Sequence, residues 1–255
     1  METNFSKNEK SLPIVINKDA SSAKNSLAAF QTELSSENSL EIKIRTQSPM
    51  KIGDYLYYTP CIGKGSFSRV FIGHKIGETS RYVAIKRTSI SQAKKMSMDR
   101  LKREIKILKT IDHPNIVKFY DAFTDVAHNV YIITEFCNYG NLSKYIDNEK
   151  LDENTIRKYM TQFKDGLYYL LSNNIVHRDI KPENILLHKD KDGNVIVKIA
   201  DLGFAKCFDN LEEETMLQTL CGTPMYLAPE VLGSKKYTIV SDLWSVGIII
   251  YQLFI

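Results

Sequence analysis

The residues that could carry chemistry in this chain gather in two short segments. Residues 177–184 read HRDIKPEN and place an aspartate, a lysine and an asparagine within six positions, and Asp201 follows Asn184 by seventeen positions. The carboxylate of Asp179 can orient a hydroxyl group, whereas Asn184 and Asp201 can hold Mg²⁺ against nucleotide phosphates. These residue types at this spacing predict phosphoryl transfer.

The first half of the chain must help to position this group, and its pattern predicts a small lobe rich in strands. Short runs of β-branched and aromatic residues predict strands near 55–58, 69–74, 82–86, 116–123 and 130–136. Apolar residues at 98, 101, 105 and 108 recur at helical spacing and predict a helix over 97–110. We therefore expect five strands and one helix before the segment 177–184.

Beyond Gly140 the pattern becomes helical. Apolar residues recur along 154–173 at the three- and four-residue spacing of a helix that buries one face. Residues 190–194, DKDGN, predict the turn of a hairpin. The second part of the chain is therefore expected to be mainly helical, with the candidate residues on its loops.

Composition limits the class of protein. The chain has 255 residues, of which 43% are hydrophobic and 25% charged, as in ordinary globular proteins. The net charge of +4 is modest, and the sequence has no long Lys/Arg stripe with interleaved aromatic residues. We therefore expect no nucleic-acid partner.

Cysteine placement and apolar runs predict a cytoplasmic protein. The four cysteines, at 61, 137, 207 and 221, form no CxxC pair, which favours a reducing compartment over a disulfide framework. The first ten residues lack the apolar core of a signal peptide. The apolar run 243–255 is short for a membrane span, so we expect a buried helix there and no membrane span.

The first 49 residues differ from the rest and predict a mostly disordered tail. They contain nine Ser and five Asn, and their six basic and six acidic side chains cancel in charge. Regulatory phosphorylation and an inert tail are both compatible with this composition. The folded domain is expected to occupy 50–255.

Glycines at 63 and 65 lie between two predicted strands and could cover phosphate groups. Glycine lets backbone N–H groups approach phosphate oxygens because no Cβ intervenes. A strand rather than a helix follows them, which excludes a dinucleotide-binding fingerprint. An ordinary hairpin turn is the alternative interpretation.

Together these segments resemble the eukaryotic protein kinases. VAIK at 83–86, HRDIKPEN at 177–184 and DLG at 201–203 match short motifs of that family. The resemblance covers about 52–255 and implies an α+β, bilobal protein-kinase fold. The small lobe, 50–137, would hold five strands and one helix, and the mainly α-helical lower lobe, 138–255, would be incomplete at its C-terminal end.

The resemblance assigns catalytic roles to four side chains. Asp179 would accept the hydrogen bond of a substrate hydroxyl, and Lys181 would stabilise the transferring phosphoryl group. Lys181 followed by Pro-Glu is similar to serine/threonine kinases rather than tyrosine kinases. Lys86 would contact the α- and β-phosphates with Glu104 as its partner, although a solvated Glu104 paired with basic neighbours is an alternative.

The resemblance also implies ATP and Mg²⁺ as cofactors. Asn184 and Asp201 would hold the metal, and the backbone of Glu135 and Cys137 would bind adenine. Most members of the family carry Gly and Phe where this chain has Ser68 and Leu202. The residues expected to bind the nucleotide are Ile62, Gly63, Lys64, Gly65, Ser66, Phe67, Ser68, Val70, Ala84, Lys86, Thr134, Glu135 and Cys137.

Residues 201–230 resemble the activation segment of the family. Thr219 is the first candidate for a regulatory phosphosite, and Thr215 is the second. Arg178 and Lys206 could form the cationic pocket that receives the phosphate.

Within the superfamily, residues 219–230, TLCGTPMYLAPE, are most similar to the UNC-51-like, autophagy-initiating kinases. By this resemblance Thr223 would contact Asp179 and Lys181. Asp242 would anchor the backbone of the catalytic loop.

The chain stops inside the helix that carries Asp242, whereas the family normally continues. We therefore expect Glu230 to lack the arginine that pairs with it in the family, and the apolar end 246–255 to lack its cover, which could attract a partner. Two hypotheses follow. The favoured one is a serine/threonine kinase acting on protein hydroxyls, because all catalytic side chains are present; the other is a truncated, inactive nucleotide-binding interaction module.

Overall fold

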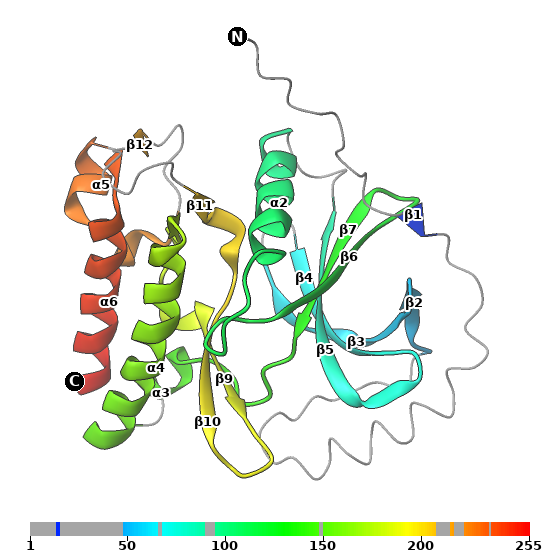
Figure 1. The fold of residues 1–255 in the computed structure, drawn as a ribbon, viewed down its shortest axis with the longest axis horizontal. Helices are drawn as coiled ribbons and strands as arrows, with labels where there is room; N and C mark the ends of the chain where they lie inside the picture. The colour runs from blue at the N-terminus through cyan, green and yellow to red at the C-terminus, as the bar shows by residue number, and fades with distance from the viewer. Residues whose placement is uncertain are drawn as a thin grey trace.

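The fold comes from a computed structural model that describes residues 14–15, 48–65, 68–89, 95–147, 150–207, 215–216, 222–234 and 236–255. In Figure 1 the strands of the first half form one lobe and the helices of the second half form another. Residues 136–138 link the two lobes. The bilobal α+β architecture expected from the sequence is confirmed.

The small lobe is built on one sheet of seven strands (Figure 1). In spatial order they are β1 (Ile14–Val15), β6 (Phe119–Asp125), β7 (Asn129–Glu135), β5 (Glu78–Ser89), β4 (Ser68–Lys75), β3 (Tyr55–Lys64) and β2 (Met50–Ile52). Neighbouring strands are antiparallel except β1 and β6, which are parallel. Tyr57, Phe71, Ile85 and Ile133 belong to one buried cluster that packs this sheet.

The sheet has two strands more than the five expected. β1 and β2 contribute two and three residues, too few for an alternating pattern to be recognised in the sequence. β1 also falls within the segment for which the sequence predicts disorder. The rest of that segment up to residue 47 lies outside the described residues, so the prediction of a disordered tail stays a prediction.

α2 (Lys95–Leu108) joins the small lobe to the lower lobe. Leu101 and Ile105 are buried in a core cluster that also contains Ile180 and Leu202 of the lower lobe. Burying each such side chain stabilises the fold by about 1.5–3 kcal/mol. The same helix carries Glu104, which is 5% exposed, towards the lower lobe.

The lower lobe contains α3 (Ser143–Asp147), α4 (Glu153–Ser172), α5 (Pro229–Ser234) and α6 (Ile239–Phe254) (Figure 1). Asp152 caps α4, because its carboxylate accepts the N–H of Thr155 at 3.0 Å. A Cβ on Gly166 would come within 2.8 Å of the Asn115 carbonyl oxygen, so glycine permits the close approach of α4 to that loop. The buried face of α4 includes Ile156, Tyr159, Phe163, Leu167 and Leu170.

A hairpin of β9 (Ile185–Lys189) and β10 (Val195–Ile199) supports the candidate residues. Because Ile185 pairs with Ile199, Asn184 and Ala200 are neighbours at the open end of the hairpin. The Ala200 N–H donates to the Asn184 carbonyl at 2.9 Å. The predicted turn at 190–194 closes the other end.

Short elements complete the lower lobe. β8 (Ile175–Val176) pairs with β11 (Lys206–Cys207), and β12 (Thr215–Met216) pairs with β13 (Lys236–Tyr237). The 3-10 helices are η1 (Pro182–Asn184), η2 (Leu202–Phe204) and η3 (Pro224–Tyr226). The pairing of β8 with β11 brings residues 177–179 beside the chain that follows Asp201.

α6 has a buried face and an exposed face. Asp242, Ser245 and Ile249 are buried, whereas Trp244 and Tyr251 are 48% and 68% exposed. A partner that covers this apolar surface stays a prediction. Among the described residues, no helix has the length and apolar character needed to cross a membrane.

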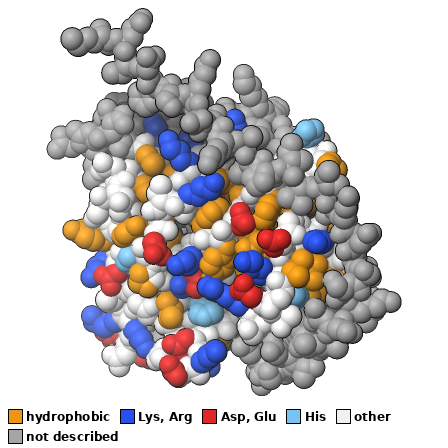
Figure 2. All heavy atoms as spheres, turned by 45° about the vertical axis from the view of Figure 1, so that its right-hand side comes forward, with side chains coloured by type: hydrophobic (Ala, Val, Ile, Leu, Met, Phe, Trp, Pro, Cys, Tyr) orange, Lys and Arg blue, Asp and Glu red, His pale blue; other side chains and the backbone are white. Residues whose placement is uncertain are grey.

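The surface drawn in Figure 2 mixes both signs of charge. Lys and Arg side chains lie among Asp and Glu side chains and around hydrophobic ones. The described residues of this face therefore form no extended basic patch.

Candidate active site

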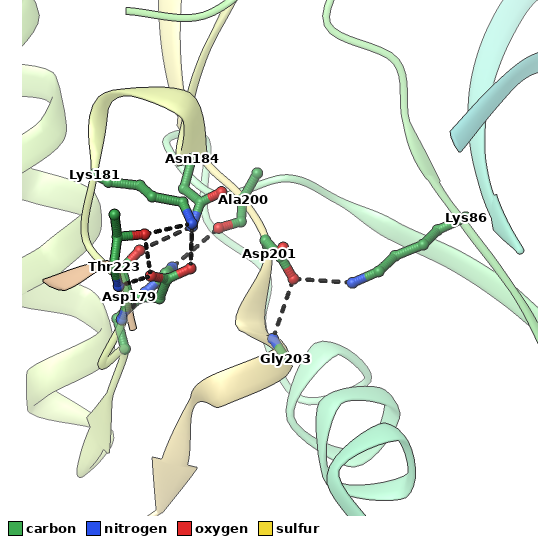
Figure 3. A network of polar contacts seen from close by, with 9 residues as sticks. Lys86, Asp179, Lys181, Asn184, Ala200, Asp201, Gly203 and Thr223 are labelled. Atoms are coloured by element: carbon green, nitrogen blue, oxygen red, sulfur yellow. Dashed lines mark hydrogen bonds and ion pairs between the residues drawn. The ribbon is translucent and has the colours of Figure 1, made fainter. Parts of the chain in front are cut away.

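A lysine on β5 connects three elements of the site. Lys86 Nζ lies 2.8 Å from Glu104 Oε1 on α2 and 2.9 Å from Asp201 Oδ1 in the lower lobe (Figure 3 shows the second contact). The Glu104 side chain is 7% exposed, so it is buried against Lys86 rather than solvated. The structure thus brings together three residues that the sequence places 18 and 115 positions from Lys86 or from one another.

Charge and burial oppose each other in this cluster. Burial alone would lower the pKa of Lys86, but the Glu104 and Asp201 carboxylates outweigh it, and the pKa of Lys86 is raised. The Lys86 ammonium holds the pKa of Asp201 below its ordinary value. Burial raises the pKa of Glu104 even though Lys86 opposes the shift. Lys86 and Asp201 therefore form a charged pair at neutral pH.

Asp201 has an uncommon backbone conformation. Its φ of 59° lies in the left-handed region, and its Oδ1 also accepts the N–H of Gly203 at 3.4 Å (Figure 3). A Cβ on Gly203 would come within 3.1 Å of Asp201 Oδ1 and 3.4 Å of Glu104 Oε2, so glycine leaves room for both carboxylates. Leu202 between them is 1% exposed and fills an apolar packing position.

Asp179 lies at the centre of a second polar cluster (Figure 3). Its Oδ2 lies 2.8 Å from Lys181 Nζ and accepts Asn184 Nδ2 at 3.0 Å. Its Oδ1 accepts the backbone N–H of Thr223 at 3.1 Å and the Thr223 hydroxyl at 3.3 Å. Lys181 Nζ also donates to Thr223 Oγ1 at 3.0 Å. The residues expected to meet a substrate hydroxyl therefore form one network.

Buried Asp242 on α6 holds the backbone that precedes Asp179. Its Oδ2 accepts the N–H of His177 at 2.9 Å, and its Oδ1 accepts the N–H of Arg178 at 3.0 Å. The Tyr237 hydroxyl donates to the same Oδ1 at 2.7 Å. Asp242 is 0% exposed, and these three donors compensate for the loss of water around its charge.

His177 is a functional neighbour that sequence reasoning missed. Its Nδ1 accepts the N–H of Asp179 at 3.2 Å, so its Nε2 carries the proton and donates to the Ala200 carbonyl at 3.0 Å. This fully buried ring ties the segment before Asp179 to the residue before Asp201. Its place at the start of HRDIKPEN was the available signal, but spacing does not reveal which carbonyl a ring reaches.

Asn184 and Asp201 fit a divalent cation by the chemistry of their oxygens. Asn184 Nδ2 donates to the Asp179 carbonyl at 2.8 Å and to its carboxylate, which leaves the amide oxygen free to act as a ligand. Asp201 uses Oδ1 for Lys86, and its side chain is 43% exposed. Amide and carboxylate oxygens are the hard ligands that Mg²⁺ prefers.

The residues expected around a nucleotide line the edge of the small lobe. Gly65 N–H donates to the Ser68 carbonyl at 2.9 Å, and a Cβ on Gly65 would come within 2.8 Å of Ser68 Oγ, so this turn needs glycine. Burial raises the pKa of the Cys137 thiol to about 12. Ile62, Gly63 and Lys64 end β3, Val70 lies in β4, and Ala84 of β5 pairs with Thr134 of β7, one residue before Glu135. Ser66 and Phe67 lie outside the described residues.

The expected phosphate-binding pair is only partly described by its contacts. Arg178 is 8% exposed, and its Nε donates to the Phe204 carbonyl at 2.7 Å. Lys206 lies in β11, beside β8. Thr219 lies outside the described residues, and for Thr215 only the backbone is described. The phosphosites and their receptor stay predictions.

Glu230 has a hydrogen-bond partner that the sequence did not predict. The Ser241 hydroxyl donates to Glu230 Oε1 at 3.2 Å. The expectation that Glu230 lacks an arginine concerns a different partner. A local contact from α6 holds this carboxylate instead.

The two polar clusters and the lobes that carry them can now be compared with known proteins. The protein kinase domain family matches residues 58–255, which is most of the chain. The chain belongs to the protein kinase family.

The relatives of this kinase domain agree with that family. It is 41% identical over 203 residues to serine/threonine-protein kinase ATG1b of Arabidopsis thaliana, covering 79% of the chain and 28% of the relative. It is 41% identical over 211 residues to serine/threonine-protein kinase atg1 of Dictyostelium discoideum, covering 80% and 31%. It is 43% identical over 197 residues to serine/threonine-protein kinase ULK1 of Homo sapiens, covering 75% and 18%.

The expected likeness to the UNC-51-like kinases is therefore confirmed. The chain spans less than a third of the length of each of these three relatives.

Proposed function

We propose that this kinase domain transfers the γ-phosphate of ATP to serine or threonine hydroxyls of a protein substrate. The observation that carries the proposal is the network in which Lys181, Asn184 and Thr223 hold the carboxylate of Asp179. The names of the three relatives, all serine/threonine-protein kinases, support the same reaction.

In the proposed reaction, Asp179 accepts a hydrogen bond from the substrate hydroxyl and directs its oxygen towards the phosphate. Lys181, 2.8 Å from Asp179, stabilises the negative charge on the transferring group. Thr223 bonds the other oxygen of Asp179, which keeps the carboxylate from rotating away.

Membership of the protein kinase family implies the use of ATP and Mg²⁺. In our proposal Asn184 and Asp201 hold the metal, which neutralises phosphate charge when it is bound. Lys86, fixed by Glu104, contacts the phosphates. The nucleotide lies against the residues of the glycine turn, Ala84 and the backbone at 134–137.

We further propose regulation by phosphorylation, with Thr219 as the first site and Thr215 as the second. Arg178 and Lys206 would then pair with the added phosphate. Mass spectrometry of active protein tests this, and finding both threonines unmodified contradicts it. The placement of the cysteines supports work in the cytoplasm.

Transfer of radiolabelled phosphate from ATP to a generic basic protein tests the proposed reaction. We expect labelled phosphoserine or phosphothreonine, and a loss of at least about 100-fold in Asp179→Asn, because that variant removes the carboxylate but keeps its shape. A thermal shift with Mg-ATP should be the same in both proteins. Nucleotide binding without transfer above the Asp179→Asn background would contradict the proposal and favour an inactive nucleotide-binding module.

A further inference from the structure

A pocket of about 490 Å³ lies beside the link between the lobes, at a place that the proposed phosphoryl transfer does not use. It is lined by residues 80–82 of β5, Tyr120 of β6, the link, and residues 188–191 at the end of the β9–β10 hairpin. Glu135 is the one residue that it shares with the set proposed to bind the nucleotide. The volume is within the range of sites that bind small molecules or the side chains of a peptide.

One wall of this link pocket is aromatic. The rings of Tyr82 and Phe136 meet edge to face, with centroids 6.4 Å apart. Phe136 is 7% exposed, and both rings pack on a buried cluster of the small lobe. Because these rings are supported from behind, they offer a rigid apolar surface to a side chain that enters the pocket.

The two carboxylates of the pocket are already satisfied from within the fold. Glu135 Oε2 lies 2.8 Å from Lys198 Nζ and accepts the Lys118 N–H at 3.2 Å. Asp190 accepts the backbone N–H of Asp192 at 3.0 Å and of Asn194 at 2.7 Å. Neither carboxylate is therefore free to neutralise a cation of the pocket.

The three cations of the pocket lack such partners. No described carboxylate lies within 4.0 Å of Arg81, Lys189 or Lys191. Arg81 donates to the neutral Tyr120 hydroxyl at 2.8 Å and lies 4.8 Å above its ring. Lys189 Nζ lies 5.5 Å from the centre of the Tyr139 ring. The pocket thus combines an apolar wall with an uncompensated positive rim.

We propose that the link pocket binds an acidic peptide segment of a partner protein, with an aromatic side chain of the segment against Tyr82 and Phe136. Its carboxylates face Arg81 on the small lobe and Lys189 and Lys191 on the lower lobe. The cations belong to different elements, so an extended chain with several carboxylates satisfies them better than one compact anion.

Such a segment would bridge the two lobes. Arg81 is carried by β5, whereas Lys191 is carried by the β9–β10 hairpin of the lower lobe. A bound segment would therefore restrain the movement of one lobe relative to the other. It would do so without entering the space between Lys86 and Asp179.

Fluorescence anisotropy with the 255-residue chain tests this proposal directly. The probe is a fluorescein-labelled decapeptide of glutamate and aspartate with one central phenylalanine, and the comparison peptide carries alanine at the centre. We expect saturable binding of the phenylalanine peptide, at least about threefold weaker binding of the alanine peptide, and weakening as salt is raised.

Charge reversal locates the binding site. The double variant Arg81→Glu, Lys191→Glu should weaken binding at least about tenfold, since it removes two cations and adds two anions. Lys158→Glu, an exposed lysine on α4 outside the pocket, is the matched control and should bind like the unaltered chain. Thermal unfolding of all three proteins verifies that they are folded.

Three results would overturn the proposal. They are the absence of saturable binding, equal weakening by Lys158→Glu and by the double variant, and displacement of the peptide by Mg-ATP. The binding assay contains no nucleotide, so it can succeed or fail independently of phosphoryl transfer.

Discussion

The two polar clusters of the site are held in different ways. Asp179 belongs to a segment whose backbone is bonded to the fully buried Asp242, and its carboxylate receives donors from its own lobe. Lys86, Glu104 and Asp201 come from three separate elements in two lobes and are joined by side-chain contacts alone. The group proposed to orient the hydroxyl is therefore part of the core, whereas the group proposed to hold phosphates depends on how the lobes are placed.

This difference suggests where activity can be controlled. A shift of α2 or of the lobes would separate Glu104 from Lys86 without breaking a backbone hydrogen bond. A shift of Asp179 would require Asp242 to release the backbone N–H groups of His177 and Arg178 inside the core. We therefore expect mutations in the first cluster to change activity more than stability, and mutations under the second to change both.

Removing Asp242 should have the largest effect. Asp242→Ala leaves two backbone N–H groups and the Tyr237 hydroxyl without their acceptor in the core, which should lower the free energy of unfolding by roughly 3 kcal/mol and abolish phosphoryl transfer. Denaturant unfolding measures the first quantity. Asp112→Ala is the control, because its side chain is 84% exposed and its pair with Lys118 should contribute less than about 0.5 kcal/mol.

Lys86→Met should separate activity from stability. Without the ammonium we expect phosphoryl transfer at saturating ATP to fall about 100- to 1000-fold, as when one stabilising donor is removed from an active site. The unfolding free energy should change by less than about 1 kcal/mol, because burial already raises the pKa of Glu104 and a proton can replace the lysine.

The control is Lys75→Met, whose lysine is 46% exposed and lies 3.6 Å from Glu78. It should alter neither quantity. If Lys86→Met unfolded as easily as Asp242→Ala, the proposed difference between the two clusters would be wrong.

The sequence could predict the parts of this comparison better than their supports. Short motifs and helical spacing indicated Asp179, Lys86 and the lobe that each belongs to, because a residue type at a fixed offset is visible in a linear string. The strands β1 and β2 were not predicted because they are too short to show a period.

The supporting contacts could not be predicted because they join residues remote in the chain. Tyr237 reaches Asp242, and His177 reaches the Ala200 carbonyl, only after α6 and the β9–β10 hairpin have packed. The link pocket is a further example. Its charge imbalance depends on Lys198 and Asn194 neutralising or bonding the nearby carboxylates, which no local pattern reveals.

Tyr237→Phe should produce a smaller effect at the rigid cluster. It removes one of three donors to Asp242 and leaves the two backbone donors in place, so we expect a loss of about 1 kcal/mol in unfolding free energy. Tyr251→Phe is the matched control, since Tyr251 is 68% exposed, and its stability should be unchanged. Equal stability of the two variants would mean that the backbone donors alone satisfy Asp242.

The smallest expected effect is a pH dependence at the charged cluster. The Lys86 ammonium lowers the pKa of Asp201 below its ordinary value of 3.8, so ionised Asp201 stabilises the fold above that pH and loses this contribution as the pH falls through its folded value. The effect is small because the Asp201 side chain is 43% exposed.

Unfolding free energies at pH 7, 5 and 3 test this in the unaltered chain and in Asp201→Asn. Their difference should be constant between pH 7 and 5 and should shrink at pH 3. In a Lys86→Met background the difference should already be lost at pH 7, since the charge that favours the ionised carboxylate is gone. A difference that persists without Lys86 would mean that backbone contacts such as the Gly203 N–H hold Asp201, and the two clusters would then be built alike.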